Sequence, residues 1–331
     1  VHLYRTFYQA PPPNASNTVG SWETPTVLFS RSDAMSHLNR YIKKLGNPVL
    51  YTDEGGRVWL FFVTVSFGGW AGSAINVTVS EDGGQHFGPV HRLTTSPFFN
   101  VSTLVRNRPV SLQDGGLLVP IYHEFIGKFC ELLWLDTSGS IRDKQRLTWG
   151  RSTLQPALVP RSASEAAVFL RAASPRTAVN VMLTRDGGKT FSPPINTGLP
   201  NSNTAIDATL LPDGRWALVY NDDPIGRDAL SIAAAQHAEG PWQTLRILAQ
   251  QRPGSDEKRF AYPVIVSPPT PPVFHLMYTV ERRYMRYETF NTSWLTPESG
   301  SATTSSQTTS SQTASSQTAP SQTAPRHEQR H

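Results

Sequence analysis

The chain has 331 residues, of which 38% are hydrophobic and only 17% charged, and its formal net charge is +5 at pH 7. So few charged residues argue against a helical protein covered with surface ion pairs, and no block of like charges suggests a nucleic-acid-binding arm. The single cysteine, Cys130, excludes an internal disulfide and a cysteine-based zinc site. The sequence contains no run of 18 apolar residues, so no membrane-spanning helix is predicted.

The predicted elements begin with a short strand in residues 3–8 and a second at 26–29, and then follow a period of about fifty residues. Two segments carry the period most clearly: residues 80–87 (SEDGGQHF) and 184–191 (TRDGGKTF). Each follows an alternating strand, at 75–79 or 179–183. Asp-Gly-Gly between strands predicts a hairpin turn, because the glycines supply positive φ angles and the aspartate bonds back to the turn amides. Weaker copies begin near residues 30, 134, 235 and 287.

Each later period contains two further predicted strands before its turn. The second strands are expected at 58–65, 117–124, 166–171, 216–221 and 273–279. The first strands are expected at 47–50, 108–111, 155–158, 207–210 and 262–265. With a fourth strand after the turn, every period forms a four-stranded antiparallel sheet, and six such sheets predict an all-β, six-bladed β-propeller over residues 1–297. The first period has no first strand, so we expect a truncated first blade and an incomplete N-terminus.

Residues 298–331 have a different composition, dominated by Ser, Thr, Gln and Pro. Glutamines recur every five positions, at Gln307, Gln312, Gln317 and Gln322. Such a segment has too few apolar residues to bury a core, so it is predicted to be a disordered, low-complexity tail.

The repeated Ser-x-Asp-Gly-Gly-x-x-Phe pattern is the Asp-box, and the sequence resembles the sialidase (neuraminidase) superfamily. Over roughly residues 20–295 it looks most like the bacterial sialidase-like proteins with Asp-box (BNR) repeats. The resemblance implies a sialidase-like (exo-alpha-sialidase family) glycoside hydrolase, or a degenerate relative, that acts on an anionic, carboxylated sugar. It also favours an exported protein, periplasmic or extracellular, although the residues from Val1 onward do not show the charged-then-apolar pattern of a signal sequence.

The inner strands of a propeller begin at its axis, so equivalent positions in successive blades converge on one pocket. Polar residues occupy the position before Pro, or before Ala208, in each first strand: Asn47, Arg108, Gln155, Asp207 and Tyr262. The second strands end in another polar ring: Thr64, His123 with Glu124, Arg171, Asn221 with Asp222, and Thr279. Two such rings predict a ligand pocket on the axis. The alternative is a water-filled channel whose polar groups pair with one another.

The resemblance implies specific roles for some of these residues. Sialidases hold the sugar carboxylate with three arginines and use a tyrosine nucleophile partnered by a glutamate, with an aspartate as acid/base. In chain order, the later part of the family's pattern reads Glu, Arg, Arg, Tyr. The corresponding positions here are Gln155, Arg171, Arg227 and Tyr262. Gln155 departs from the pattern, because an amide cannot accept the phenolic proton. The first arginine and the aspartate belong to the family's first blade, which is incomplete here.

The remaining candidates complete the predicted site. Arg108 is expected to join the two matched arginines near Tyr262, with Asn47 and Asn221 as further substrate contacts. Asp207 is a candidate acid/base, and Glu124 or Asp207 is a candidate proton acceptor for Tyr262. In the alternative interpretation, Arg171 and Arg227 are struts paired with Asp222 or Asp207, and Tyr262 is a core aromatic residue.

Two other functions fit the same residues. His123 and Glu124 beside arginines and a tyrosine also suit a uronate polysaccharide lyase, in which arginine neutralises the uronate and His or Tyr removes a proton. A glycan-binding propeller without catalysis is the third possibility. We expect no metal or cofactor, no nucleic-acid partner and no membrane span. We also expect very weak hydrolysis of a sialoside, because Gln155 removes the proton acceptor from Tyr262.

Overall fold

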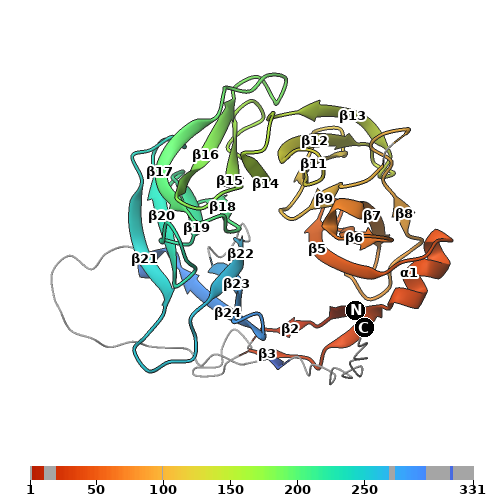
Figure 1. The fold of residues 1–331 in the computed structure, drawn as a ribbon, viewed down its shortest axis with the longest axis horizontal. Coiled ribbons are helices and arrows are strands. Elements are labelled where there is room, and N and C mark those ends of the chain that lie inside the picture. The colour runs from red at the N-terminus through yellow and green to blue at the C-terminus, as the bar shows by residue number, and fades with distance from the viewer. Residues whose placement is uncertain (1, 11–19, 99, 268–272, 296–313, 316–331) are drawn as a thin grey trace, which may run out of the picture.

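The computed structural model describes residues 2–10, 20–98, 100–267, 273–295 and 314–315. Antiparallel sheets follow one another around a central axis, so the all-β propeller is confirmed (Figure 1). No helix in the described ranges is long and apolar enough to cross a membrane.

Five sheets, here called blades I to V, form the propeller. Blade I contains β5 (Lys44–Thr52), β6 (Val58–Val65), β7 (Ser73–Ser80) and β8 (His91–Arg92). Blade II contains β9 (Leu104–Val105), β10 (Val110–Ser111), β11 (Leu117–His123), β12 (Phe129–Leu135) and β13 (Ile141–Arg146), with β9 and β10 as two parts of an interrupted inner strand. Blade III contains β14 (Thr153–Pro160), β15 (Ala166–Ala172), β16 (Thr177–Thr184) and β17 (Ile195–Asn201).

The last two blades repeat the pattern. Blade IV contains β18 (Asp207–Leu210), β19 (Trp216–Tyr220), β20 (Ala229–Ala235) and β21 (Gln243–Gln250). Blade V contains β22 (Phe260–Val266), β23 (Val273–Val280), β24 (Tyr284–Asn291) and the outer strand β25 (Ala314–Ser315). Apart from β25, the predicted tail at 298–331 lies outside the described residues. A short helix, α2 (Thr292–Leu295), follows β24.

The predicted count of six blades is not confirmed. The described N-terminal residues form two ribbons, β1 (Leu3–Arg5) with β4 (Thr26–Phe29), and β2 (Tyr8–Gln9) with β3 (Ser21–Trp22). The rings of Tyr8 and Trp22 contact Tyr287 on β24 at 4.8 and 5.1 Å. Phe29 stacks on Phe62 of β6 at 5.7 Å. The ribbons therefore lie between blades V and I (Figure 1) without forming a four-stranded sheet.

The two clear Asp-box turns are hairpins, as predicted. Gly83 and Gly84 have φ angles of 72° and 89°, and the Ser80 hydroxyl accepts a 2.9 Å hydrogen bond from the Gly84 amide. Asp82 accepts a 2.8 Å bond from the His86 amide. The turn between β16 and β17 repeats these contacts through Thr184, Asp186, Gly188 and Thr190.

Two of the weaker copies are not hairpins. Ser30 is the N-cap of helix α1 (Arg31–Leu38), because its hydroxyl and amide exchange hydrogen bonds with Asp33 in a capping box. Tyr287 lies inside β24. At Ser30 a helix cap therefore replaces the predicted turn. At Tyr287 the pairing of β24 with β23 replaces it.

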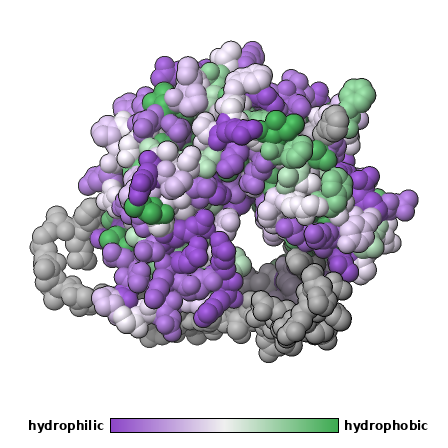
Figure 2. All heavy atoms as spheres, in the orientation of Figure 1, coloured by the Kyte–Doolittle hydropathy of each residue, from purple (hydrophilic) through white to green (hydrophobic). Residues whose placement is uncertain are grey.

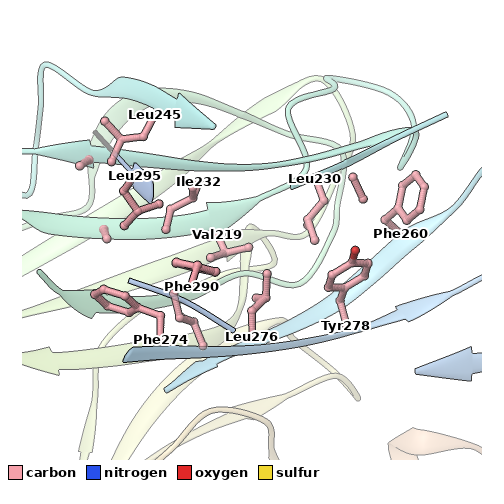
Figure 3. Packing of buried hydrophobic residues seen from close by; sticks show 14 of the residues in the cluster. Val219, Leu230, Ile232, Leu245, Phe260, Phe274, Leu276, Tyr278, Phe290 and Leu295 are labelled. Carbon is pink, nitrogen blue, oxygen red and sulfur yellow. The ribbon is translucent and has the colours of Figure 1, made fainter. Parts of the chain in front are cut away.

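The hydrophobic core is divided among the interfaces between neighbouring sheets. Both faces of each middle strand are covered, which explains continuous apolar runs such as VWLFFVTV in β6. Between blades IV and V, for example, Val219 and Ile232 pack with Phe274 and Leu276 (Figure 3). Because this packing fixes each blade against the next, the ends of the inner strands have defined positions around the axis.

Candidate functional site

Three inner strands contain a β-bulge at an X-Pro step near the same end of the strand. The pairing register shifts between Gly46 and Val49, between Leu154 and Ala157, and between Ala261 and Val264. The residue before each proline has a positive φ: 48° at Asn47, 46° at Gln155 and 57° at Tyr262. This conformation is unfavourable for residues other than glycine, and bulges commonly redirect a side chain. All three side chains contact residues of other blades.

Arg108 and Asp207 occupy the same position in their blades but have a different role. Arg108 donates hydrogen bonds to the carbonyl oxygens of Ile265 and, at 3.2 Å, Ala208. Asp207 accepts from the amides of Ala208 at 3.0 Å and Ile265 at 2.9 Å, and lies 3.8 Å from Arg108. These contacts connect blades II, IV and V. They occupy the Asp207 carboxylate, which is buried, and the structure does not bring Arg108 into contact with Tyr262.

Arg171, at the end of β15, is the centre of a hydrogen-bonded network. It is only 9% exposed. It donates to Gln155 Oε1 at 2.7 Å, to the Asn203 carbonyl at 2.8 Å and to Asn203 Oδ1 at 2.8 and 3.2 Å. Burial lowers the pKa of its guanidinium, an effect that Tyr262 and Tyr122 oppose. The network holds Arg171 in one orientation.

Two other arginines lie close to the ring of Tyr262. The guanidinium carbons of Arg106 and Arg227 lie 5.6 and 5.9 Å from the centre of its ring. Arg106 donates to the Pro263 carbonyl at 3.0 Å, and Arg227 to the Asn203 carbonyl at 3.5 Å. Burial lowers the pKa of Arg106. Within the described part of the chain, no carboxylate lies within ion-pair distance of Arg106, Arg171 or Arg227.

Sequence reasoning missed Arg106 and Tyr122. Arg106 precedes Arg108 by two residues in the gap between β9 and β10. The only sequence signal for its role was therefore its place in the segment Arg-Asn-Arg-Pro, next to the predicted Arg108. The Tyr122 hydroxyl accepts hydrogen bonds from Asn47 at 3.3 Å and Gln155 at 3.2 Å. Burial raises the pKa of Tyr122 to about 12, so it is a neutral bridge between blades I and III.

The other predicted residues are distributed between the site and the blade interiors. His123 lies 2.7 Å from Glu131 and stacks on Phe129, on the sheet of blade II. Glu124 is half-buried, and its charge acts on Arg171 and Tyr122, but its carboxylate has no hydrogen-bond partner among the described residues. Asn221 donates to the carbonyls of Ala229 and Phe260, both at 2.9 Å, and so ties blades IV and V.

The site is therefore a polar ring that runs from Asn47 through Tyr122, Gln155, Arg171 and Asn203 to Arg227, Tyr262 and Arg106. Hydrophilic residues also predominate around much of the central hollow in the space-filling view (Figure 2). Three cations without a carboxylate partner form an environment that suits an anion, because guanidinium groups bind carboxylates in paired hydrogen bonds. The described residues include no cluster of three His, Cys, Asp or Glu that could hold a metal ion.

The BNR repeat-like domain matches residues 13–276 of the chain. Comparison with curated proteins found no match. The intramolecular trans-sialidase of Ruminococcus gnavus, solved with oseltamivir carboxylate, is 12% identical, with a TM-score of 0.62 over 88% of both chains.

Two further structures have the same fold. The leech intramolecular trans-sialidase, complexed with 2,7-anhydro-Neu5Ac, is 14% identical with a TM-score of 0.63, over 88% of this chain and 64% of the leech chain. A protein of unknown function from Dyadobacter fermentans is 16% identical with a TM-score of 0.61, over 79% and 77%. This chain thus covers less than two thirds of the leech enzyme. At such low identities the likeness shows the fold alone.

Proposed function

The chain belongs to the BNR repeat-like domain family, as a sialidase-like member of the BNR-repeat superfamily, and from that premise we propose that it binds an acidic sugar of the sialic acid type. The sugar carboxylate would lie among Arg106, Arg171 and Arg227. The observation that carries the proposal is that Arg106 and Arg227 lie over the ring of Tyr262, that Tyr262 acts electrostatically on Arg171, and that none of the three arginines has a carboxylate partner in the described residues. Two structural neighbours, solved with oseltamivir carboxylate and 2,7-anhydro-Neu5Ac, are consistent with it.

Positive charge that is neither exposed nor paired is unfavourable unless a ligand compensates it. Arg171 is buried and held by Gln155 and Asn203, so little side-chain entropy is lost when it binds an anion. Tyr262 is 37% exposed and can contact the sugar beside the carboxylate. The proposed ligand therefore needs a carboxylate for the arginines and a ring for the tyrosine.

Hydrolysis by this site should be very slow. The amide of Gln155 cannot accept a proton, and its two ends are bonded to Arg171 and Tyr122. Loss of one general acid or base lowers a rate by about 10²–10⁴-fold. Asp207 is occupied by backbone amides, which leaves Glu124 as the nearby carboxylate without a partner among the described residues. Any residual turnover should depend on Tyr262 and Glu124.

Calorimetric titration with the α-methyl glycoside of N-acetylneuraminic acid tests the binding proposal. The methyl ester of the same compound is the matched control, because esterification removes the negative charge and adds only one methyl group. Binding of the acid and not of the ester is expected. Equal binding of both, or of neither, would refute the carboxylate clamp.

Release from an aryl sialoside tests the chemistry in the wild type, Tyr262→Phe and Glu124→Gln. We expect slow or undetectable release by the wild type and a further decrease in both variants wherever release can be measured. Robust release that Tyr262→Phe leaves unchanged would show that the reaction uses other residues. The uronate lyase alternative gains no support, because His123 is engaged by Glu131 and stacked on Phe129.

A further inference from the structure

Trp149 is a large aromatic side chain that the fold leaves exposed but holds in place. It follows β13 and is 75% exposed. The guanidinium carbon of Arg146 lies 4.4 Å from the centre of the Trp149 ring and 3.8 Å from that of Phe129. Phe129 in turn stacks on His123 with ring centres 4.3 Å apart and planes 16° from parallel. The indole is therefore the outer member of a series of stacked groups that begins inside blade II.

A buried carboxylate fixes this series. Glu131 is only 3% exposed, and its oxygens lie 2.7 Å from His123, 3.5 Å from Arg146 and 3.9 Å from Lys144. A buried ion pair with several partners restrains the side chains that form it. Arg146 is thus held under Trp149, and the exposed indole has a defined orientation.

A cavity of about 390 Å³ lies beside this indole. Its walls are uncharged and come from Leu147, Thr148, Trp149, Ser152, Thr153, Asn180 and Pro194. The hydroxyls of Thr148 and Thr153 are bonded to each other at 2.7 Å at a buried position. The Ser152 hydroxyl and the Asn180 side-chain oxygen have no hydrogen-bond partner in the described ranges, so both are available to a ligand.

We propose that this cavity is a second carbohydrate site, which binds a neutral sugar ring. The apolar face of a pyranose would pack on Trp149, as flat apolar surfaces pack on aromatic rings, while its hydroxyls would bond to Ser152 and Asn180. The absence of charged groups from the walls distinguishes it from the arginine site and favours a neutral ligand. Thr153 of the cavity and Gln155 of the arginine site lie on the same strand, β14.

The assignment gives His123 and Glu131 a role outside the arginine site. They orient Arg146, which orients the indole. They act through Trp149 and are positioning residues.

The test uses lactose, cellobiose and chitobiose as neutral probes, with saturation-transfer NMR and calorimetric titration of the full chain. The wild type should bind at least one of them. Trp149→Ala should weaken that binding by about tenfold or more, as expected for loss of an aromatic contact worth roughly 1.5 kcal/mol. Trp149→Phe should retain part of the affinity. If the wild type binds none of the three probes, the proposal is overturned.

Two matched controls isolate the cavity. Phe125→Ala removes an aromatic side chain that is 61% exposed but does not line the cavity, and Trp294→Ala removes another exposed tryptophan on α2. Neither should change the neutral-sugar affinity. If Phe125→Ala weakens binding as much as Trp149→Ala, the ligand is held by a general apolar surface and the assignment is wrong.

A parallel titration of Trp149→Ala with the acidic sugar separates the two sites. The proposal predicts that this variant keeps the thermal stability of the wild type and its acidic-sugar affinity, and loses only the neutral-sugar affinity. If the acidic sugar does not bind even to the wild type, the proposed function fails, but the neutral probes still decide this inference.

Discussion

The side-chain oxygen of Gln155 accepts a 2.7 Å hydrogen bond from the guanidinium of Arg171. The other end of the same amide donates to the Tyr122 hydroxyl at 3.2 Å. An amide satisfies Arg171 without neutralising it, whereas a carboxylate at this position would form an ion pair inside the site. The glutamine therefore keeps the positive charge of Arg171 available to a ligand, at the expense of a proton acceptor.

Gln155→Glu should weaken binding of the acidic sugar. The new carboxylate would pair with Arg171 and repel the carboxylate of the ligand. We expect the affinity to fall by about 10–100-fold, since a hydrogen bond to a charged group is worth roughly 1.5–3 kcal/mol. Calorimetric titration with the α-methyl sialoside measures it, and an increase in affinity would show that the ligand carboxylate does not bind beside Arg171.

Arg171→Met and Arg227→Met should both lose acidic-sugar binding but differ in stability. Arg171 is buried with four hydrogen bonds, and its removal leaves buried acceptors on Gln155 and Asn203, so its loss should cost about 2–4 kcal/mol of unfolding free energy. Arg227 is half-buried with one 3.5 Å hydrogen bond, and its loss should change stability by about 0.5 kcal/mol or less. Urea denaturation of both variants provides the comparison. Equal destabilisation would contradict the assigned roles.

Tyr122→Phe should destabilise the fold at neutral pH. The change removes a buried acceptor from Asn47 and Gln155, which should cost about 1–3 kcal/mol. Burial raises the pKa of Tyr122 to about 12 in the folded protein. Since the unfolded value is about 10, the wild type loses stability between about pH 10 and pH 12, by up to about 1.4 kcal/mol per pH unit for this group.

Urea denaturation at pH 7 and at several pH values above 9 tests this difference. The stability gap between the wild type and Tyr122→Phe should narrow as the pH rises, because only the wild type carries the group that titrates. Burial also raises the pKa of Tyr220 to about 12, and that contribution is common to both proteins. A gap that stays constant with pH would exclude Tyr122 as the titrating group.

Asp186→Asn should destabilise blade III at neutral pH and make its stability less dependent on pH. The Thr190 hydroxyl and amide lower the pKa of Asp186 to about 2. A lowered pKa stabilises the fold above the unfolded value of about 4, and this stabilisation disappears as the pH falls through about 2. The melting temperature of the variant should therefore be lower at pH 5–7 and should approach that of the wild type near pH 2.

Glu81→Gln is the control for the Asp-box prediction. Glu81 is exposed in the turn of blade I, and its carboxylate forms no hydrogen bond within the described residues. Its melting temperature should match that of the wild type at each pH. A similar loss in both variants would indicate a general effect of charge and not the hairpin contacts.

The sequence by itself determined the repeating unit of the fold. The predicted strands at 26–29, 58–65 and 207–210 coincide with β4, β6 and β18, and the two Asp-Gly-Gly hairpins have the predicted contacts. These features depend on local chemistry, namely apolar runs for buried strands and glycines for positive φ angles. The polar residue before Pro, or before Ala208, was likewise visible, because it recurs at the same place in the five periods that have a predicted first strand.

Only the tertiary structure decided which polar residues form the site. At the shared position, Asn47, Gln155 and Tyr262 lie in bulges, whereas Arg108 and Asp207 brace the blades. Arg106, and not Arg108, lies over Tyr262, because blade II has an interrupted inner strand. A bulge or an interruption changes the direction of a side chain without changing the sequence period, since strand residues alternate between faces. Periodicity therefore located the ring, and the register of each strand with its neighbour decided which side chains enter it.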